Sequence, residues 1–170
     1  MAEERTYLCI DMKSFYASVE CADLGLNPFE TNLVVADLER GKNALCLAIS
    51  PKMKTLGVRN RCRVSEIPPG VEYIAAKPRM KRYIDCAADI YALYLNHFDP
   101  RDMHVYSIDE TFIDATPYRG AMKTDGVTLA KRLTDEIART LHISQQAVSG
   151  RLKRARGMLR ARLEGREEDD

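Results

Sequence analysis

The chain has 170 residues, of which 45% are hydrophobic, and its formal net charge is +1 at pH 7. This length fits one domain of ordinary size, or one domain with a small helical module. No apolar run approaches the roughly 18 residues that a membrane span needs. The polar start, residues 1–5, lacks the apolar core of a signal peptide, so we expect a cytoplasmic protein with no membrane partner.

Two further features of the composition concern the cysteines and the distribution of charge. The five cysteines are scattered without a CxxC pair, which argues against a disulfide scaffold or a zinc site and favours reduced, buried thiols. Residues 138–166 hold 8 basic and 1 acidic side chains, whereas residues 1–137 hold 18 basic and 20 acidic ones. Such a basic block is typical of a protein with a polyanionic partner, although a solvated helix face is the alternative.

The first half of the chain predicts short strands around one helix. Strands are expected over residues 7–10, 33–36 and 45–49, and a helix over residues 14–23. The turn at residues 39–43 makes an antiparallel hairpin of the second and third strands. Ser50 followed by Pro51 predicts a short helix, with serine as the N-cap, that ends at Gly57.

The second half predicts longer helices. A strand is expected over residues 71–74, a long helix over 78–98, and a hairpin over 104–113. Two more helices are expected, over residues 128–141 and 145–163. Because several connections read as hairpins, we predict an α+β fold with helices on one face of a sheet, rather than a doubly wound parallel sheet.

Two acidic clusters lie beside predicted strands. Asp11 follows the first strand, and Asp109 and Glu110 lie at the predicted tip of the 104–113 hairpin. Converging carboxylates repel each other unless cations separate them, and Mg²⁺ prefers such hard oxygen ligands. The spacing alone is equally compatible with an Asp11 that caps the following helix and an Asp109-Glu110 pair that is a solvated turn.

Three motifs in order resemble those of the Y-family, or translesion, DNA polymerases. They are Tyr7-Leu-Cys-Ile-Asp-Met-Lys-Ser-Phe-Tyr-Ala-Ser-Val-Glu20, Cys46-Leu-Ala-Ile-Ser-Pro-Lys-Met-Lys-Thr-Leu-Gly-Val58 and Tyr106-Ser-Ile-Asp-Glu-Thr-Phe-Ile-Asp114. The second motif is similar to the fingers of the UmuC-like branch. The resemblance covers about residues 5–137. It implies a ferredoxin-like palm with a small fingers element, and an enzyme of DNA repair linked to the SOS response.

The resemblance also implies roles for individual residues. Two Mg²⁺ ions would be held by Asp11, Asp109 and Glu110, with the carbonyl of Met12 as a further ligand. The incoming deoxynucleoside triphosphate would meet Phe15, Tyr16 and Lys54, with Tyr16 as the steric gate against a ribose 2′-hydroxyl. The alternative for Phe15 and Tyr16 is that both are core aromatics. Many members of the family carry tyrosine or threonine near Ser50-Pro51, so the triphosphate contacts differ in detail here.

The C-terminal segment resembles a different family, the fourth conserved region of bacterial sigma factors. The stretch Asp135-Glu-Ile-Ala-Arg-Thr-Leu-His-Ile-Ser-Gln-Gln-Ala-Val-Ser-Gly-Arg-Leu-Lys-Arg-Ala-Arg-Gly-Met-Leu-Arg160 carries this resemblance, which implies a DNA-binding helix-turn-helix. Val148 and Leu152 would pack the second helix against the first. The side chains left for the groove and phosphates of duplex DNA would be Gln145, Gln146, Ser149, Arg151, Lys153 and Arg154. The alternative is a polymerase palm helix followed by a basic tail.

The sequence thus predicts three segments: a palm and fingers fragment over residues 1–133, a helix-turn-helix over 134–165, and an acidic disordered tail over 166–170. The principal functional hypothesis is two-metal nucleotidyl transfer onto a primer 3′-hydroxyl, with primer-template DNA and deoxynucleoside triphosphates as partners. Because a thumb and little finger are absent, we expect this chain alone to be a very weak or inactive polymerase. The alternative hypothesis is a transcription-regulatory protein that binds DNA through the helix-turn-helix.

Overall fold

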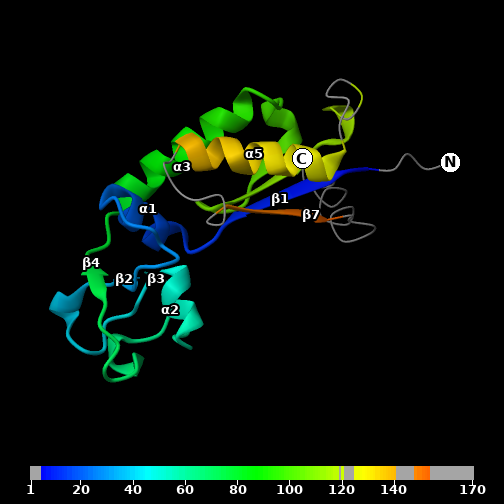
Figure 1. Cartoon of the computed structure of the whole chain (residues 1–170). Coiled ribbons are helices and arrows are strands. Elements are labelled where there is room, and N and C mark those ends of the chain that lie inside the picture. Colours follow the sequence, from blue (N-terminus) through cyan, green and yellow to red (C-terminus); the bar gives the residue numbers. More distant parts are fainter. Residues whose placement is uncertain (1–4, 119, 121–124, 141–147, 154–170) are drawn as a thin grey trace, which may run out of the picture.

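The computed structural model describes residues 5–118, 120, 125–140 and 148–153. These residues form two lobes, each built on its own β-sheet (Figure 1). The first sheet has the strand order β5-β6-β1-β7, and the second has the order β3-β2-β4. Along the described parts of the chain, no helix is long and apolar enough to cross a membrane.

The larger lobe is centred on strand β1 (Tyr7–Met12), which pairs antiparallel with β6 (Glu110–Asp114) on one side and with β7 (Val148–Lys153) on the other. Strand β5 (Met103–Val105) completes the sheet beside β6. Helices α1 (Phe15–Asp23), α3 (Met80–Leu95) and α5 (Gly126–Thr140) belong to the same lobe. Figure 1 shows α3 and α5 together on one side of the sheet.

The core of this lobe lies between the sheet and its helices. Side chains alternate between the two faces of a strand, and Leu8, Ile10 and Met12 of β1 are all buried in the main core cluster. The helices contribute the other side of that cluster, including Tyr83 and Leu133. The intervening β1 residues, Tyr7, Cys9 and Asp11, therefore belong to the opposite face, which the core cluster does not include.

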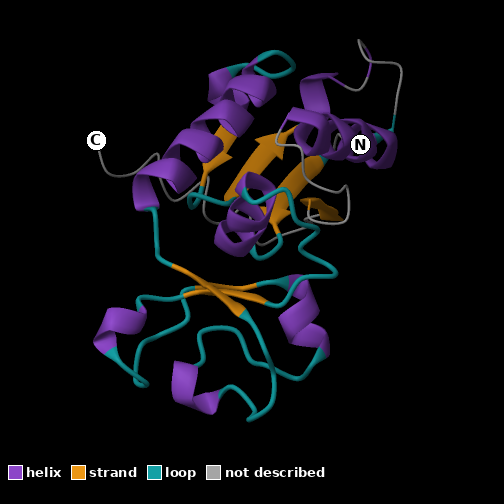
Figure 2. Cartoon of the chain, turned by 60° about the vertical axis from the view of Figure 1, so that its left-hand side comes forward, coloured by secondary structure: helices purple, strands orange, loops and turns teal. Residues whose placement is uncertain are grey.

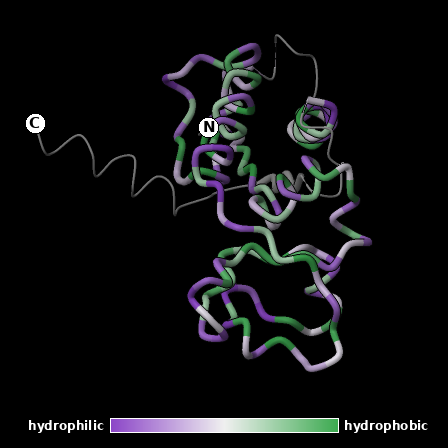
Figure 3. Tube along the Cα trace, turned by 90° about the vertical axis from the view of Figure 1, so that its left-hand side faces the viewer, coloured by the Kyte–Doolittle hydropathy of each residue, from purple (hydrophilic) through white to green (hydrophobic). Residues whose placement is uncertain are grey.

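The smaller lobe contains β2 (Leu33–Val35), β3 (Ala48–Ile49), β4 (Ile74–Ala76) and helix α2 (Pro51–Thr55). Strand β2 is central and pairs antiparallel with β3, as the predicted hairpin requires, and parallel with β4. Figure 2 shows the three strands on the side of this lobe that faces the larger lobe, with short helices and loops beyond them. The lobe has its own core, formed by Val34, Ala36, Cys46, Ile49, Met53, Val58, Cys62 and Ile67. Hydrophobic stretches accordingly appear in both lobes (Figure 3).

The predicted cap at the start of α2 is confirmed and connects the helix to β2. Ser50 is fully buried, and its Oγ accepts hydrogen bonds from the backbone N–H of Met53 at 3.3 Å and of Leu33 at 3.2 Å. The same hydroxyl donates to the carbonyl of Thr31 at 2.7 Å. Replacing Ser50 with alanine would leave these buried groups without partners.

We expect Ser50→Ala to lower the free energy of unfolding by about 1 to 3 kcal/mol, the usual cost of unsatisfied buried polar groups. Equilibrium denaturation with guanidinium measures this change. Ser65→Ala is the matched control, because Ser65 is exposed in the same lobe, and surface substitutions usually change stability by less than about 0.5 kcal/mol. Equal stability of the two variants would contradict the structural role of Ser50.

One expected element is wrong. Helix 145–163 was predicted from apolar residues that include Val148 and Leu152, yet residues 148–153 form strand β7. A spacing of four residues fits a helical period of 3.6 and also a strand period of 2, so Val148 and Leu152 alone cannot distinguish a helix from a strand. The run Val-Ser-Gly-Arg-Leu-Lys in fact alternates apolar or small with polar residues, and Gly150 disfavours a helix.

The energetic reason for the strand lies in β1. Without β7, the central strand would present an unpaired row of backbone N–H and C=O groups at an edge of the sheet. The predicted recognition helix therefore does not form over Ser149, Arg151 and Lys153, whereas Gln145, Gln146 and Arg154 lie outside the described residues. The division at residues 133/134 stays a prediction, although α5 runs across it. The predicted tail over 166–170 also lies outside the described residues.

Candidate catalytic site at the end of strands β1 and β6

The three predicted carboxylates lie at one end of the β1–β6 pair. Asp11 and Glu110 are directly opposite each other in the antiparallel register, which places such Cβ atoms roughly 5 Å apart on the same face of a sheet. The backbone N–H of Met12 donates to the carbonyl of Asp109 at 3.0 Å. Segments separated by about a hundred residues in sequence are thereby joined, and all three acidic side chains are half-buried.

The turn between β5 and β6 positions Asp109. The backbone N–H groups of Tyr106 and Ser107 both donate to the carbonyl of Glu110, at 3.0 and 3.1 Å. The hydroxyl of Ser107 donates to Oδ1 of Asp109 at 2.8 Å. The predicted hairpin tip is confirmed, and its hydrogen bonds hold the Asp109 carboxylate next to the end of β1.

Asp11 does not cap the following helix. The N-cap of α1 is Ser14 instead, in a left-handed conformation with φ of 51°, and its side chain makes no capping hydrogen bond. A left-handed non-glycine residue is uncommon and marks a sharp change of chain direction. The Oγ of Ser14 is one of the buried polar atoms of the described residues that have no hydrogen-bond partner. This turn therefore offers an unused donor three residues after Asp11.

Tyr16 is the second residue of helix α1. Burial raises the pKa of its hydroxyl, the negative charge of Asp109 raises it further, and the positive charge of Arg61 lowers it. Charged groups of both lobes therefore act on the Tyr16 hydroxyl. Tyr16 is only partly buried, whereas its neighbour Phe15 is 3% exposed and belongs to the core. The expected core packing is thus observed for Phe15, whereas Tyr16 packs against the edge of the same core and stays partly exposed.

The chain also matches a known family. The family model described as "impB/mucB/samB family" matches residues 10–153 of the chain. The chain belongs to this family of Y-family DNA polymerase domains. The match includes β7, which supports the strand rather than a separate module over residues 148–153.

Several curated proteins resemble this Y-family chain. "Putative UV-damage repair protein UvrX" of Bacillus subtilis is 38% identical over 112 residues, which are 65% of this chain and 27% of that protein. "DNA repair protein homolog YozK" of the same organism is 37% identical over 60% of this chain and 90% of its own length. "DNA polymerase IV 2" of Bacillus subtilis is 36% identical over 84% of this chain and 34% of its own length. The chain therefore spans about a third or less of two of these relatives.

Solved structures share the fold. "Crystal Structure of DinB from Sulfolobus solfataricus" matches with a TM-score of 0.71 and 24% identity, over 87% of this chain and 42% of that one. "Y-family DNA polymerase chimera Dbh-Dpo4(243-245)-Dbh" matches with a TM-score of 0.72 and 23% identity, over 86% of this chain and 42% of that one. The two lobes together share the mixed α/β fold of a Y-family palm and fingers, and we refer to the larger lobe as the palm and to the smaller one as the fingers.

The donor set of the palm suits a divalent ion that also binds substrate. Among the residues that the structure describes, no three His, Cys, Asp or Glu side chains converge as a complete metal-binding group. Mg²⁺ commonly takes only one or two carboxylates and completes its shell with water and substrate phosphates. The opposed pair Asp11 and Glu110, with Asp109 beside them, fits this mode of binding and does not form an all-protein cage.

The remaining predicted site residues that the structure describes lie in the fingers lobe and in β7. Lys54 is an exposed residue of α2 in the fingers lobe. Arg61, from the loop that follows α2, is the fingers residue whose charge acts on Tyr16. Ser149 lies opposite Asp11 in the register of β7, and Arg151 lies opposite Cys9. Sequence reasoning missed Tyr83, whose ring stacks on Tyr16, because no local spacing relates residues so far apart.

The expected buried, reduced thiols are observed. All five cysteines are free and buried. Burial raises the pKa of the Cys21 thiol to about 11 and, together with the neighbouring Cys62, that of Cys46 to about 12. In an unfolded chain the pKa of a cysteine thiol is about 8.5. Because the folded chain holds these protons more tightly, the associated stability is complete below that pH and is lost as the pH rises through about 11 to 12.

The native chain is therefore expected to react slowly with a thiol reagent such as DTNB near pH 8, since all five thiols are buried and shielded from the reagent. After unfolding in guanidinium, all five thiols of the sequence should react. Absorbance of the released thionitrobenzoate counts them in both states. Rapid reaction of one equivalent with the folded chain would contradict the buried placement.

Proposed function

We propose that this chain acts as the palm and fingers of a translesion DNA polymerase, with Asp11, Asp109 and Glu110 as ligands of two Mg²⁺ ions. The observation that carries the proposal is the cross-strand pairing of Asp11 with Glu110, with Asp109 hydrogen-bonded through its carbonyl to the next residue of β1. When bound, the two Mg²⁺ ions would activate a primer 3′-hydroxyl and stabilise the leaving pyrophosphate. The carbonyl of Met12, at the end of β1, would be a further ligand.

The protein residues around these carboxylates would bind and orient the nucleotide. The charge of Asp109 acts on Tyr16, and we propose that the Tyr16 ring meets the sugar of an incoming deoxynucleoside triphosphate. Lys54 and Arg61 of the fingers would neutralise phosphate charge. The unpaired Oγ of Ser14 would donate to a phosphate oxygen. Phe15 would act indirectly, by packing the start of α1 into the core.

We expect only weak nucleotide addition, because the chain matches less than half of the length of the solved polymerase chains. The chain spans 42% of the two solved polymerase chains described above. A duplex held by fewer contacts dissociates faster, so we expect weak, template-directed addition of single nucleotides that requires Mg²⁺ and stops with EDTA. Primer extension with the protein in large excess over primer-template tests this. Addition that ignores the template base, or that persists in EDTA, would contradict the proposed function.

Two finer resemblances were expected from the sequence, one to the UmuC-like branch and one to the helix-turn-helix of sigma factors. Membership of the UmuC-like branch stays a prediction, because the relatives described above are named UvrX, YozK and DNA polymerase IV 2. A transcription regulator would need its second helix over residues 145–163, and β7 occupies six of these positions. We therefore propose no second function, and we propose that the basic block over residues 138–166 contacts the phosphates of primer-template DNA.

A further inference from the structure

A buried tyrosine of α3 lies directly against the candidate steric gate. The rings of Tyr16 and Tyr83 stack with centroids 4.3 Å apart and an interplanar angle of 12°. Tyr83 is fully buried, and its hydroxyl donates to Oε1 of Glu20 at 2.6 Å. Burial, followed by this hydrogen bond, raises the pKa of Tyr83, so the hydroxyl stays a donor. Tyr83 is thus fixed at its hydroxyl and presents one ring face to Tyr16.

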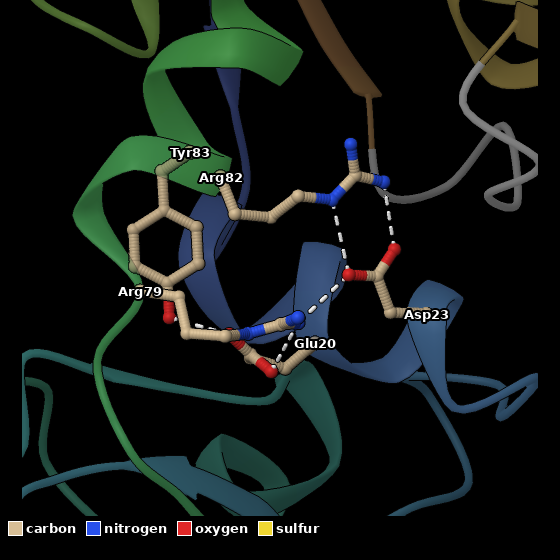
Figure 4. Close-up of polar contacts among 5 residues, drawn as sticks. All are labelled: Glu20, Asp23, Arg79, Arg82 and Tyr83. Carbon is tan, nitrogen blue, oxygen red and sulfur yellow. Dashed lines mark hydrogen bonds and ion pairs between the residues drawn. The ribbon is translucent and has the colours of Figure 1, made fainter.

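Glu20, which accepts this hydrogen bond, is itself held by an ion-pair network (Figure 4). It is 5% exposed, and Arg79 donates to its two oxygens, from Nε at 3.0 Å and from Nη2 at 2.7 Å. Arg79 also donates to Asp23 at 2.7 Å, and Asp23 accepts two further bonds from Arg82, at 3.0 and 2.7 Å. Bidentate pairing of this kind fixes orientation as well as charge.

The geometry of α1 connects the network to the gate. Tyr16 and Glu20 are four residues apart, so they lie one helical turn apart on the same face of α1. Both contact the same partner, Tyr83, one through its ring and the other through its carboxylate. A ring can exclude a ribose 2′-hydroxyl only if it cannot rotate away from it. The stacked ring of Tyr83 blocks one side of that rotation.

We propose that Tyr83 and Glu20 are positioning residues that fix the ring of Tyr16 and thereby set the selectivity for deoxyribonucleotides over ribonucleotides. This inference rests on the proposed function, in which Tyr16 meets the sugar of the nucleotide. It predicts that the stacked ring matters more than the hydroxyl, since the ring makes the direct contact. It also predicts that Glu20 acts only through Tyr83.

The first test measures sugar selectivity as the ratio of deoxyribonucleotide to ribonucleotide addition in single-turnover primer extension. Tyr83→Leu removes the stacking ring and is expected to lower this ratio about tenfold, which is the upper range for an aromatic pair. Tyr83→Phe keeps the ring and is expected to stay within about threefold of the wild type. Adding Tyr83→Leu to Tyr16→Ala should cause no further loss, because coupled residues are not additive.

Tyr94→Leu is the matched control, since Tyr94 is equally buried in the same helix. It is expected to lower stability while leaving the ratio unchanged. An unchanged ratio in Tyr83→Leu, an equal loss in Tyr94→Leu, or a further loss in the double variant would each overturn the inference.

A second readout does not depend on catalysis. Fluorine NMR of the chain labelled with 3-fluorotyrosine gives a Tyr16 signal that Tyr16→Phe identifies. We expect this signal to shift and broaden in Tyr83→Leu, to change less in Glu20→Gln, and to stay unchanged in Tyr94→Leu. An unchanged Tyr16 signal in the folded Tyr83→Leu and Glu20→Gln variants would overturn the positioning role. Absence of nucleotide addition by the wild type would instead contradict the proposed function.

Discussion

Replacing Asp109 with asparagine is expected to lower the rate of single-nucleotide addition by at least about a hundredfold, because a metal-binding charge at the reacting centre is worth several kcal/mol. The substitution keeps the size of the side chain and removes one of three carboxylates at the end of the β1–β6 pair. Single-turnover primer extension with Mg²⁺ and excess protein measures the rate, since chemistry is then separated from weak binding of the duplex.

Asp114→Asn provides the matched control for this prediction. Asp114 lies at the other end of β6, opposite Tyr7, and its Oδ1 accepts the backbone N–H of Thr116 at 2.9 Å. An asparagine oxygen can accept the same bond, so addition should stay within about twofold of the wild type, as for a substitution away from the reacting groups. Equal rates for the Asp109 and Asp114 variants would remove Asp109 from the catalytic site.

Ending the chain after Thr140 is expected to destabilise the palm lobe by roughly 3 to 9 kcal/mol, at about 0.5 to 1.5 kcal/mol for each lost ladder hydrogen bond. Strand β7 pairs with β1 at six positions, from Tyr7 to Met12. Domains are stable by only about 5 to 15 kcal/mol, so this loss is a large fraction of the total. Denaturant-induced unfolding, followed by circular dichroism, measures it.

A chain that ends after Lys153 retains β7 and is the control for the truncation. If β7 stabilises the palm by pairing with β1, the chain that ends after Lys153 should keep most of the stability that the chain ending after Thr140 loses. A helix-turn-helix module independent of the palm predicts instead that both truncations leave palm stability unchanged. Equal unfolding midpoints for the two truncated chains would therefore contradict the structural role of β7.

Most of the palm could be predicted from local patterns. The apolar run before Asp11, the long amphipathic helix that became α3, and the hairpin that carries Asp109 and Glu110 all have strong periodic or turn signals. The motifs also predicted a site at Asp11, Asp109 and Glu110, and the register of β1 and β6 places these three positions at one end of the strand pair. These predictions succeeded because each depends on residues close together in sequence, where period and turn chemistry act directly.

The failures arose where long-range pairing decides the structure. Val148 and Leu152 fit helix and strand equally well, and the open edge of β1, together with Gly150, favours the strand. The contact between Tyr16 and Tyr83 joins α1 to α3, and neither helix carries a local signal for it. Likewise, nothing in the local sequence distinguishes Arg61 from Arg59 and Arg63, whereas in the folded chain the charge of Arg61 acts on the Tyr16 hydroxyl.

The central claim, that the carboxylates at the end of β1 and β6 hold Mg²⁺ together with a nucleotide, is tested most directly by calorimetric titration of the chain with dATP. The account predicts binding of dATP in Mg²⁺ that is lost in EDTA, lost in Asp109→Asn, and retained in Asp114→Asn. Binding of equal strength without Mg²⁺, or binding that Asp109→Asn leaves unchanged, would contradict it.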